Sequence, residues 1–248
     1  MNFVRILQES SYFVRNRYPI IATFTMLYAL NTLILYAFFN PFDLEMLQAG
    51  QSKISSSEVF LACFNLFISL VLNIWFILTI DQVSTNRVAD IFACVPMILQ
   101  KIVGFVGYNL LIMLVLTPFI IGASIVLTIN SLGGGGDLQF FFICAFFLLI
   151  SVYFAARVIL LPIAYLVEPG KKGFKALYQL VNVRRSYLAI LVYLVLVYFI
   201  PMYLSGVIIE LLGENLLILS IFINAFINLF SLIFAYRFYH IFIKSNSL

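Results

Sequence analysis

Hydrophobic residues occupy long unbroken stretches of this chain, separated by short polar segments. Six stretches are long enough to cross a membrane as helices, since a spanning helix needs about 20 apolar residues. They cover approximately residues 18–40, 59–80, 102–129, 138–166, 187–211 and 215–243. A transmembrane barrel would show alternating segments of about ten residues, and these stretches do not alternate. The pattern therefore predicts an all-α polytopic membrane protein with six transmembrane helices.

Three shorter stretches have the amphipathic spacing of a helix, and they precede the first, third and fifth predicted spans. Their shared faces consist of Phe3, Ile6, Leu7, Ser10 and Val14; of Val88, Ile91, Phe92, Val95 and Leu99; and of Phe174, Leu177, Tyr178 and Val181. A helix of this kind buries its apolar side at the headgroup boundary of a membrane. We therefore expect three helical hairpins, each preceded by an interfacial helix.

Basic residues indicate the orientation, because Lys and Arg near the ends of spans are retained on the cytoplasmic side. Thirteen of the fourteen basic residues lie in or beside the two termini, the segment between the second and third spans, and the segment between the fourth and fifth. Lys53 alone falls on the other side. The asymmetry predicts that both termini and all three interfacial helices are cytoplasmic.

We expect residues 1–248 to form a single integral membrane domain. The order of one amphipathic helix followed by two spans recurs over residues 1–80, 81–167 and 168–248, with little residue identity between the three. The recurrence indicates possible parallel repeats. Parallel repeats weaken, without excluding, a transporter of the kind in which inverted repeats enclose a midplane substrate site.

Composition narrows the function further. The chain is 64% apolar and 10% charged, far below the charged share of about one quarter in soluble domains. Its net charge of +4 follows from the topology, so we expect no nucleic-acid partner. Three cysteines without a C-x-x-C motif and a single histidine, His240, predict no metal site and no cofactor. No nucleophile lies among titratable groups that would activate it, and we therefore predict that the protein is not an enzyme.

Arg157 is the strongest candidate for a polar site within a span, because a charge at mid-bilayer costs about 3 kcal/mol or more. It lies inside the fourth predicted span, residues 138–166. In one interpretation that span ends near Arg157, and Val158–Val167 forms a shallow continuation bent by Pro162. In the other, Arg157 is buried and pairs with Asp81 or with a lipid phosphate.

Asparagines within the spans are the next candidates. Asn224 and Asn228 are four residues apart and so share one face of the sixth span, which makes them a candidate intramembrane polar site together with Arg157. Hydrogen bonds between helices are the ordinary use of such residues, and they contribute about 0.6 to 2 kcal/mol each. The same alternative applies to Asn31, Asn65, Asn73 and Asn109.

The third amphipathic stretch is the most basic. Its Lys and Arg residues are candidate contacts for anionic lipid headgroups, since each contributes about 1 kcal/mol near a charged membrane surface. They are Lys171, Lys172, Lys175, Arg184 and Arg185. The predicted partners are therefore membrane lipids on the cytoplasmic side, with any protein partner unknown.

Four segments of the chain form a recognisable set: Tyr12-Phe13-Val14-Arg15-Asn16, Pro96-Met97-Ile98-Leu99-Gln100-Lys101, the third span around Pro118, and Tyr236-Arg237-Phe238-Tyr239. In these segments the chain resembles the YciC family of bacterial inner-membrane proteins. The resemblance covers nearly the whole chain and implies six spans in the inner membrane of a Gram-negative bacterium. It implies no activity and no catalytic residues, because none is established for the family.

Two functions remain open from the sequence. The first is a noncatalytic inner-membrane protein that organises lipid or partner proteins in the cell envelope, supported by three basic interfacial helices. The second is a transporter of a lipid-like or small solute, which a continuous polar path through Asn109, Arg157, Asn224 and Asn228 would support. We favour the first.

Overall fold

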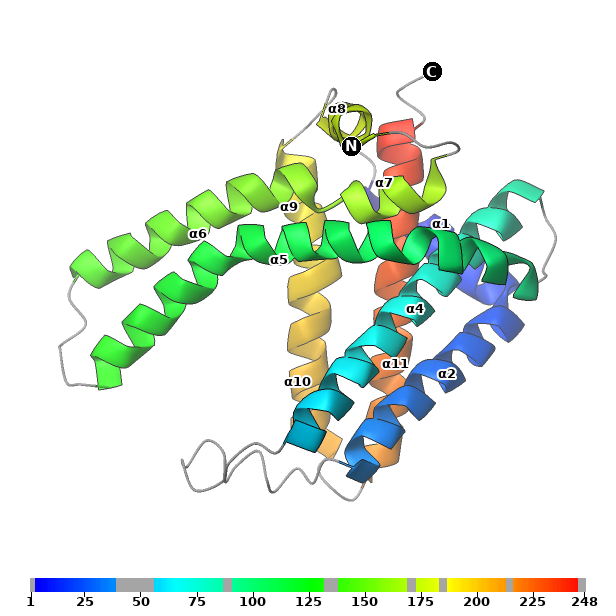
Figure 1. Ribbon diagram of the computed structural model, residues 1–248, viewed down its shortest axis with the longest axis horizontal. Coiled ribbons are helices and arrows are strands. Elements are labelled where there is room, and N and C mark those ends of the chain that lie inside the picture. Colours follow the sequence, from blue (N-terminus) through cyan, green and yellow to red (C-terminus); the bar gives the residue numbers. More distant parts are fainter. Residues whose placement is uncertain are drawn as a thin grey trace. The chain divides into compact units, whose positions relative to one another are not determined.

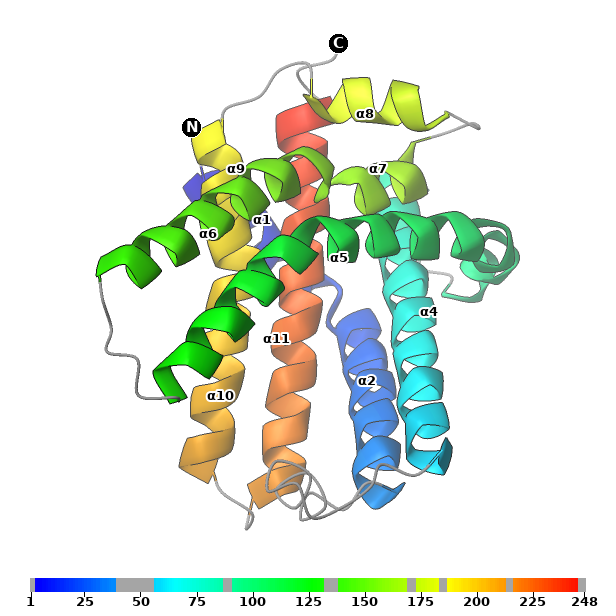
Figure 2. The ribbon, with the colours of Figure 1, turned by 60° about the vertical axis from the view of Figure 1, so that its left-hand side comes forward.

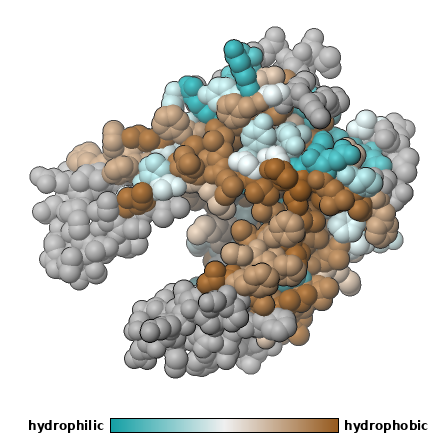
Figure 3. All heavy atoms as spheres, in the orientation of Figure 1, coloured by the Kyte–Doolittle hydropathy of each residue, from teal (hydrophilic) through white to brown (hydrophobic). Residues whose placement is uncertain are grey.

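The computed structural model of the chain describes residues 3–38, 56–86, 91–131, 138–168, 173–182, 187–212 and 216–244. All elements in these ranges are helices, which confirms the all-α prediction for them. Five helical stretches there are long and apolar enough to cross a membrane: Tyr18–Ala37, Val59–Thr85, Val95–Val115, Val192–Leu212 and Leu217–Ile241. Hydrophobic residues cover most of the described surface on the face shown in Figure 3. These features indicate a multi-pass membrane protein.

The chain divides into two compact units. Unit 1 contains Met1–Ile102 and Val195–Phe238, and unit 2 contains Val103–Leu194 and Tyr239–Leu248. Each unit combines segments that are far apart in the sequence. The limits of the units differ from those of the three possible repeats, so the repeats stay a prediction about the order of elements.

Four helices form the body of unit 1. They are α2 (Tyr18–Phe38), α4 (Ser56–Asn86), α10 (Ile200–Leu212) and α11 (Leu217–Phe238). α11 packs against the other three, and α2 also packs against α4. Figures 1 and 2 show these helices running side by side. The centre of the packing is aromatic: the buried Phe24 ring of α2 lies 5.4 Å from Trp75 and 4.8 Å from Phe76 of α4, measured between ring centroids.

The first predicted interfacial helix forms as α1 (Phe3–Asn16), which contacts α11 and α2. Its buried residues are Ile6, Ser10 and Phe13, spaced three and four apart as one helical face requires. Ile6 and Ser10 belong to the predicted apolar face and are covered by the protein together with Phe13, whereas Leu7 of the same face is 44% exposed. The packing of α1 against α11 decides the difference, which the spacing along α1 alone does not determine.

The second predicted interfacial helix is not a separate element in the described residues. Val88 lies outside them, Phe92–Cys94 form a short 3-10 helix (η1), and α5 begins at Val95. α5 then runs without a break to Ser131, so Val95 and Leu99 of the predicted interfacial helix lie on the same helix as the third predicted span, residues 102–129. At 1.5 Å per residue, its 37 residues extend about 55 Å, well beyond a hydrocarbon core of about 30 Å.

The fourth predicted span, residues 138–166, is divided in the structure and is not among the five spanning stretches found in the described residues. α6 (Leu138–Val158) ends before a turn at Ile159 and Leu160, and α7 (Leu161–Val167) follows. Pro162 occupies the first turn of α7. Proline is tolerated there because its missing N–H would have no partner in a first turn. The helix therefore restarts close to the point where Pro162 was expected to bend it.

Unit 2 is built from α6, α7, α8 (Phe174–Asn182), α9 (Tyr187–Leu194) and the part of α5 from Val103 onward. α8 packs on α6 and α7, and its Leu177 and Val181 are buried. α5 and α6 lie side by side in Figures 1 and 2. Gly122 permits their close approach, because a Cβ there would meet the Phe147 side chain at 3.0 Å.

The fifth span contains an irregularity that Pro201 explains. α9 continues through a π-helical stretch, η2 (Val195–Phe199), into α10. Proline cannot donate to the preceding turn, and its ring displaces the carbonyl four residues earlier. A π turn in the residues just before Pro201 accommodates that displacement. A second π-helical stretch, η4 (Tyr239–Lys244), follows α11.

Candidate functional site

Asn224 and Asn228, predicted to share a face of the last span, line one cavity in unit 1. Its volume is about 210 Å³. The other residues that line it come from α2, α10 and α11: Tyr28, Thr32, Tyr36, Ile209, Ser220, Ile221 and Ala225. We call this the asparagine cavity. Arg157 and Asn109, the other members of the predicted polar path, belong to unit 2.

Most hydroxyl groups around the asparagine cavity donate their hydrogen bonds to acceptors within the protein. Tyr28 donates from Oη to Asn73 Oδ1 at 2.5 Å, while Thr32 and Ser220 donate to the backbone carbonyls of Tyr28 and Leu217. Asn224 Oδ1 is buried and has no hydrogen-bond partner among the described residues. The lining mixes polar and apolar side chains and contains no formal charge, which suits water or a small neutral solute better than an ion.

Other asparagines of the spans connect helices. Asn31 donates from Nδ2 to Ser69 Oγ at 2.9 Å, and Asn65 donates from Nδ2 to the Asn31 carbonyl at 2.9 Å. Both bonds join α2 to α4. Asn109 instead donates to the Phe105 carbonyl of its own helix. These contacts are the structural use expected of polar residues in spans.

Arg157 lies in the last turn of α6 and is half-buried. It donates from Nη1 to Tyr178 Oη of α8 at 3.3 Å and from Nη2 to Tyr153 Oη, and its guanidinium lies 4.7 Å from the Tyr153 ring centroid. Two tyrosines of unit 2 therefore contact its guanidinium. Asp81, the partner considered from the sequence, belongs to unit 1, where it accepts a hydrogen bond from Tyr236.

The candidate headgroup contacts of the third amphipathic stretch fall mostly outside the described residues. Lys175 lies on α8 and is exposed. Lys171, Lys172, Arg184 and Arg185 are not among the residues that the structure describes.

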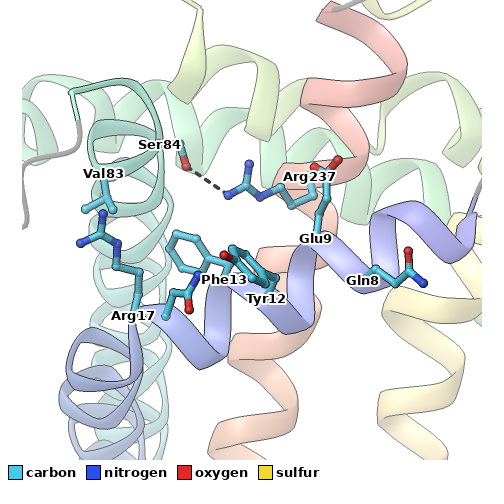
Figure 4. Close-up of a pocket in the computed structure, with 9 residues that line it drawn as sticks. Gln8, Glu9, Tyr12, Phe13, Arg17, Val83, Ser84 and Arg237 are labelled. Carbon is cyan, nitrogen blue, oxygen red and sulfur yellow. Dashed lines mark hydrogen bonds between the residues drawn. The ribbon is translucent and has the colours of Figure 1, made fainter.

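A second hollow in unit 1 was not predicted, and it contains two arginines. Its volume is about 480 Å³, and α1, the turn after it, α4 and α11 all contribute to its lining. We call it the arginine pocket, and Figure 4 shows eight of its residues labelled. The lining residues are Gln8, Glu9, Tyr12, Phe13, Asn16, Arg17, Val83, Ser84 and Arg237.

Local structure holds Arg17 at the edge of this pocket. It occupies the turn between α1 and α2, where its N–H donates to the Phe13 carbonyl at 2.9 Å and its carbonyl accepts from Ile21 N–H at 3.2 Å. Pro19 lies in the first turn of α2, a position in which proline favours the start of a helix. The backbone of Arg17 is thereby fixed, while its side chain extends beside Val83 of α4 (Figure 4).

Arg237 enters the pocket from the last turn of α11. Its guanidinium lies 5.4 Å from the Phe13 ring centroid and 5.8 Å from the Tyr236 ring centroid, distances at which aromatic faces attract cations. Nη2 donates to Ser84 Oγ at 3.5 Å, a long and therefore weak hydrogen bond. Nε is buried and has no hydrogen-bond partner among the described residues. Most of its donors therefore have no acceptor from the described chain.

The charges of the arginine pocket do not cancel. Glu9 is its one carboxylate, and it pairs with Arg5 across 3.0 Å, outside the pocket lining. Among the described residues, neither Arg17 nor Arg237 forms an ion pair. A guanidinium presents a planar set of donors that fits carboxylate and phosphate oxygens. The arrangement can therefore bind an anion.

Sequence reasoning used Arg17 and Arg237 only as indicators of orientation. They are separated by more than two hundred residues, and each lies at the end of a different apolar stretch, where basic residues are common. The one relevant signal was the amphipathic spacing of α1, which placed a helix beside Arg17. Nothing in the spacing indicated that α1 would pack on the end of α11.

The described residues contain no group of three or more His, Cys, Asp or Glu side chains placed to hold a metal ion. Comparison of the chain with models of protein families, with curated proteins and with solved structures found no match. The surfaces and cavities of the described residues are accordingly the basis for a function.

Proposed function

We propose that this chain is a noncatalytic multi-pass protein of a bacterial inner membrane that organises lipid at the cytoplasmic surface. The single observation that carries the proposal is the surface of α1. Buried Ile6, Ser10 and Phe13 fasten the helix to the bundle, while its opposite side remains both apolar and basic.

The free side of α1 fits the headgroup boundary of a bilayer. Val4 is 64% exposed and Tyr12 68% exposed, and the exposed Arg15 lies on the same side. Val4, Leu7, Gln8, Ser11, Tyr12 and Arg15 line one shallow hollow on it. Apolar residues at this position enter the upper acyl region, and basic residues meet anionic headgroups. α1 can therefore bind lipid through its exposed side while its buried side stays packed on the helical bundle.

The orientation and helix number belong to the same proposal. The bias of Lys and Arg favours cytoplasmic termini, which places α1 and the arginine pocket on the cytoplasmic side. Six spans remain our preferred arrangement, with α6 crossing the membrane and α7 continuing from it. Membership of the YciC family, suggested by the short segments around Tyr12, Pro96, Pro118 and Tyr236, agrees with this arrangement and supports an inner-membrane location.

Detergent-free extraction of the protein with its surrounding lipid tests the proposal. Mass spectrometry should find the anionic fraction of that lipid higher than around an unrelated six-span protein from the same membrane. Serine at both Val4 and Leu7 should reduce the enrichment, because it removes the apolar contacts of α1. The matched control carries serine at Met26 and Leu30, which are exposed on α2. Equal lipid composition around this protein and the six-span protein would refute a lipid-organising role.

The asparagine cavity supports a second candidate, a transporter of a small polar solute. A transport path must admit water at the depth of Asn224. In a variant whose native cysteines are replaced, Asn224→Cys should then react with a hydrophilic thiol reagent, and Ile223→Cys, one residue away on α11, should react far more slowly. Similar low reactivity at the two positions would rule out the transporter.

A further inference from the structure

We infer that the arginine pocket binds a phosphate group, held between Arg17 and Arg237 and carried by an anionic lipid headgroup or by a soluble phosphate. A lipid source for that phosphate rests on the proposed function above. Binding of a phosphate group as such depends only on the residues of the pocket.

The pocket has the size of a ligand site. Its volume of about 480 Å³ falls within the range of about 300 to 1,000 Å³ that small-molecule sites occupy. Three separate parts of the chain form its walls: α1 with the turn that follows it, the end of α4, and the last turn of α11 (Figure 4). Packing of α1 on α11 thus supplies a rigid frame for the two arginines.

The donors of the pocket suit phosphate oxygens. The Phe13 ring lies under the Arg237 guanidinium at 5.4 Å and limits its rotation, so little conformational entropy is lost when an anion binds. Arg17 adds a second guanidinium from the other side of the Phe13 side chain, as Figure 4 shows. Asn16 and Gln8 bring amide N–H groups to the same lining. Two guanidinium groups with polar neighbours are a common means of holding phosphate.

Glu9 determines how strong the site is. Its carboxylate lies in the lining and repels an anion, and Arg5 offsets that repulsion through the 3.0 Å ion pair. The pair is solvent-exposed, with side chains 65% and 34% exposed, so the offset is incomplete. Removing the Glu9 charge should therefore strengthen phosphate binding.

The first measurement is binding of inorganic phosphate to the purified full-length protein by calorimetry. Arg17→Gln and Arg237→Gln should each weaken binding about tenfold or more, since each removes charge-assisted hydrogen bonds. Arg15→Gln is the matched control. It removes the same charge, and Arg15 is exposed on α1 and does not line the pocket. It should weaken binding less than about fivefold. Glu9→Gln should strengthen binding severalfold.

The second measurement identifies the source of the phosphate. The protein is placed in phosphatidylcholine nanodiscs containing some phosphatidylglycerol, and retained lipid is counted by native mass spectrometry. Phosphatidylglycerol retention that Arg17→Gln and Arg237→Gln each reduce further than Arg15→Gln does assigns the site to a lipid headgroup, because Arg15 measures the contribution of the exposed side of α1. Binding of inorganic phosphate without such retention assigns it to a soluble phosphate, and the lipid-organising proposal would then be judged on the extraction experiment alone.

Loss of binding counts only in a folded variant, which circular dichroism and gel filtration establish. If Arg237→Gln fails to fold, Arg237→Lys replaces it, because lysine keeps the positive charge over the Phe13 ring. The phosphate affinities of Arg17→Gln and Glu9→Gln then decide whether the pocket binds phosphate. A phosphate-binding pocket is excluded if neither phosphate nor phosphatidylglycerol binds, or if Arg17→Gln weakens binding no more than Arg15→Gln does.

Discussion

Phe24→Ala should lower the free energy of unfolding by about 3 kcal/mol, the low end of the range for removing a buried phenylalanine. The Phe24 side chain is fully buried between Trp75 and Phe76, so its loss leaves a cavity where α2 meets α4. In lipid the transfer of apolar groups from water contributes less to packing between spans, and the lost dispersion contacts account for most of the effect. Unfolding in mixed micelles of dodecyl sulfate and a mild detergent measures the change.

Phe60→Ala is the matched control for Phe24→Ala. Phe60 lies on α4 and is 70% exposed, and the same substitution there should change the free energy of unfolding by less than about 0.5 kcal/mol. Equal effects at Phe24 and Phe60 would mean that α2 and α4 do not pack through this aromatic cluster.

Tyr236→Phe should lower the free energy of unfolding by about 2 kcal/mol. Tyr236 is fully buried in α11 and donates from Oη to Asp81 Oδ1 of α4 at 2.9 Å. A hydrogen bond to a carboxylate is stronger than one between neutral groups, and its loss costs about 1.5 to 3 kcal/mol. The bond joins two spans whose sequence positions differ by 155, so it should contribute to the packing of α4 on α11. The same mixed-micelle titration measures the loss.

Tyr203→Phe, at a site that is 73% exposed on α10, should leave the free energy of unfolding nearly unchanged. A double-mutant cycle with Asp81→Asn then separates the contact from the side chains themselves. A coupling energy near zero between positions 81 and 236 would show that the hydrogen bond contributes nothing to stability.

Periodicity along the chain predicted the elements that depend on local spacing. Long apolar stretches marked spans because backbone groups in lipid must be satisfied within a helix, and five such stretches are present in the described residues. Spacing of three and four likewise predicted α1 and α8. Length alone predicted one span over residues 138–166, whereas the interpretation in which the span ends near Arg157 and Pro162 bends the continuation matches the end of α6 at Val158 and the start of α7 at Leu161.

Of the predicted intramembrane polar site, the structure brings Asn224 and Asn228 together in one cavity, and Arg157 does not line that cavity. Asn224 and Asn228 line one cavity, as a spacing of four requires, but their surroundings come from α2 and α10, which periodicity on α11 does not describe. For Arg157, the structure supplies Tyr153 and Tyr178 as neighbours. Tyr178 belongs to α8, and only the packing of α8 on α6 brings it there.

The sequence by itself determined that this protein is a helical multi-pass membrane protein and that its basic residues are distributed asymmetrically, because each follows from the chemistry of neighbouring residues in lipid. The tertiary structure alone decided which side of α1 is buried, leaving Leu7 exposed and Phe13 covered. It also decided that Arg17 and Arg237 share a pocket. Both outcomes depend on contacts between segments at opposite ends of the chain, and such contacts leave no periodic signal in the sequence of either segment.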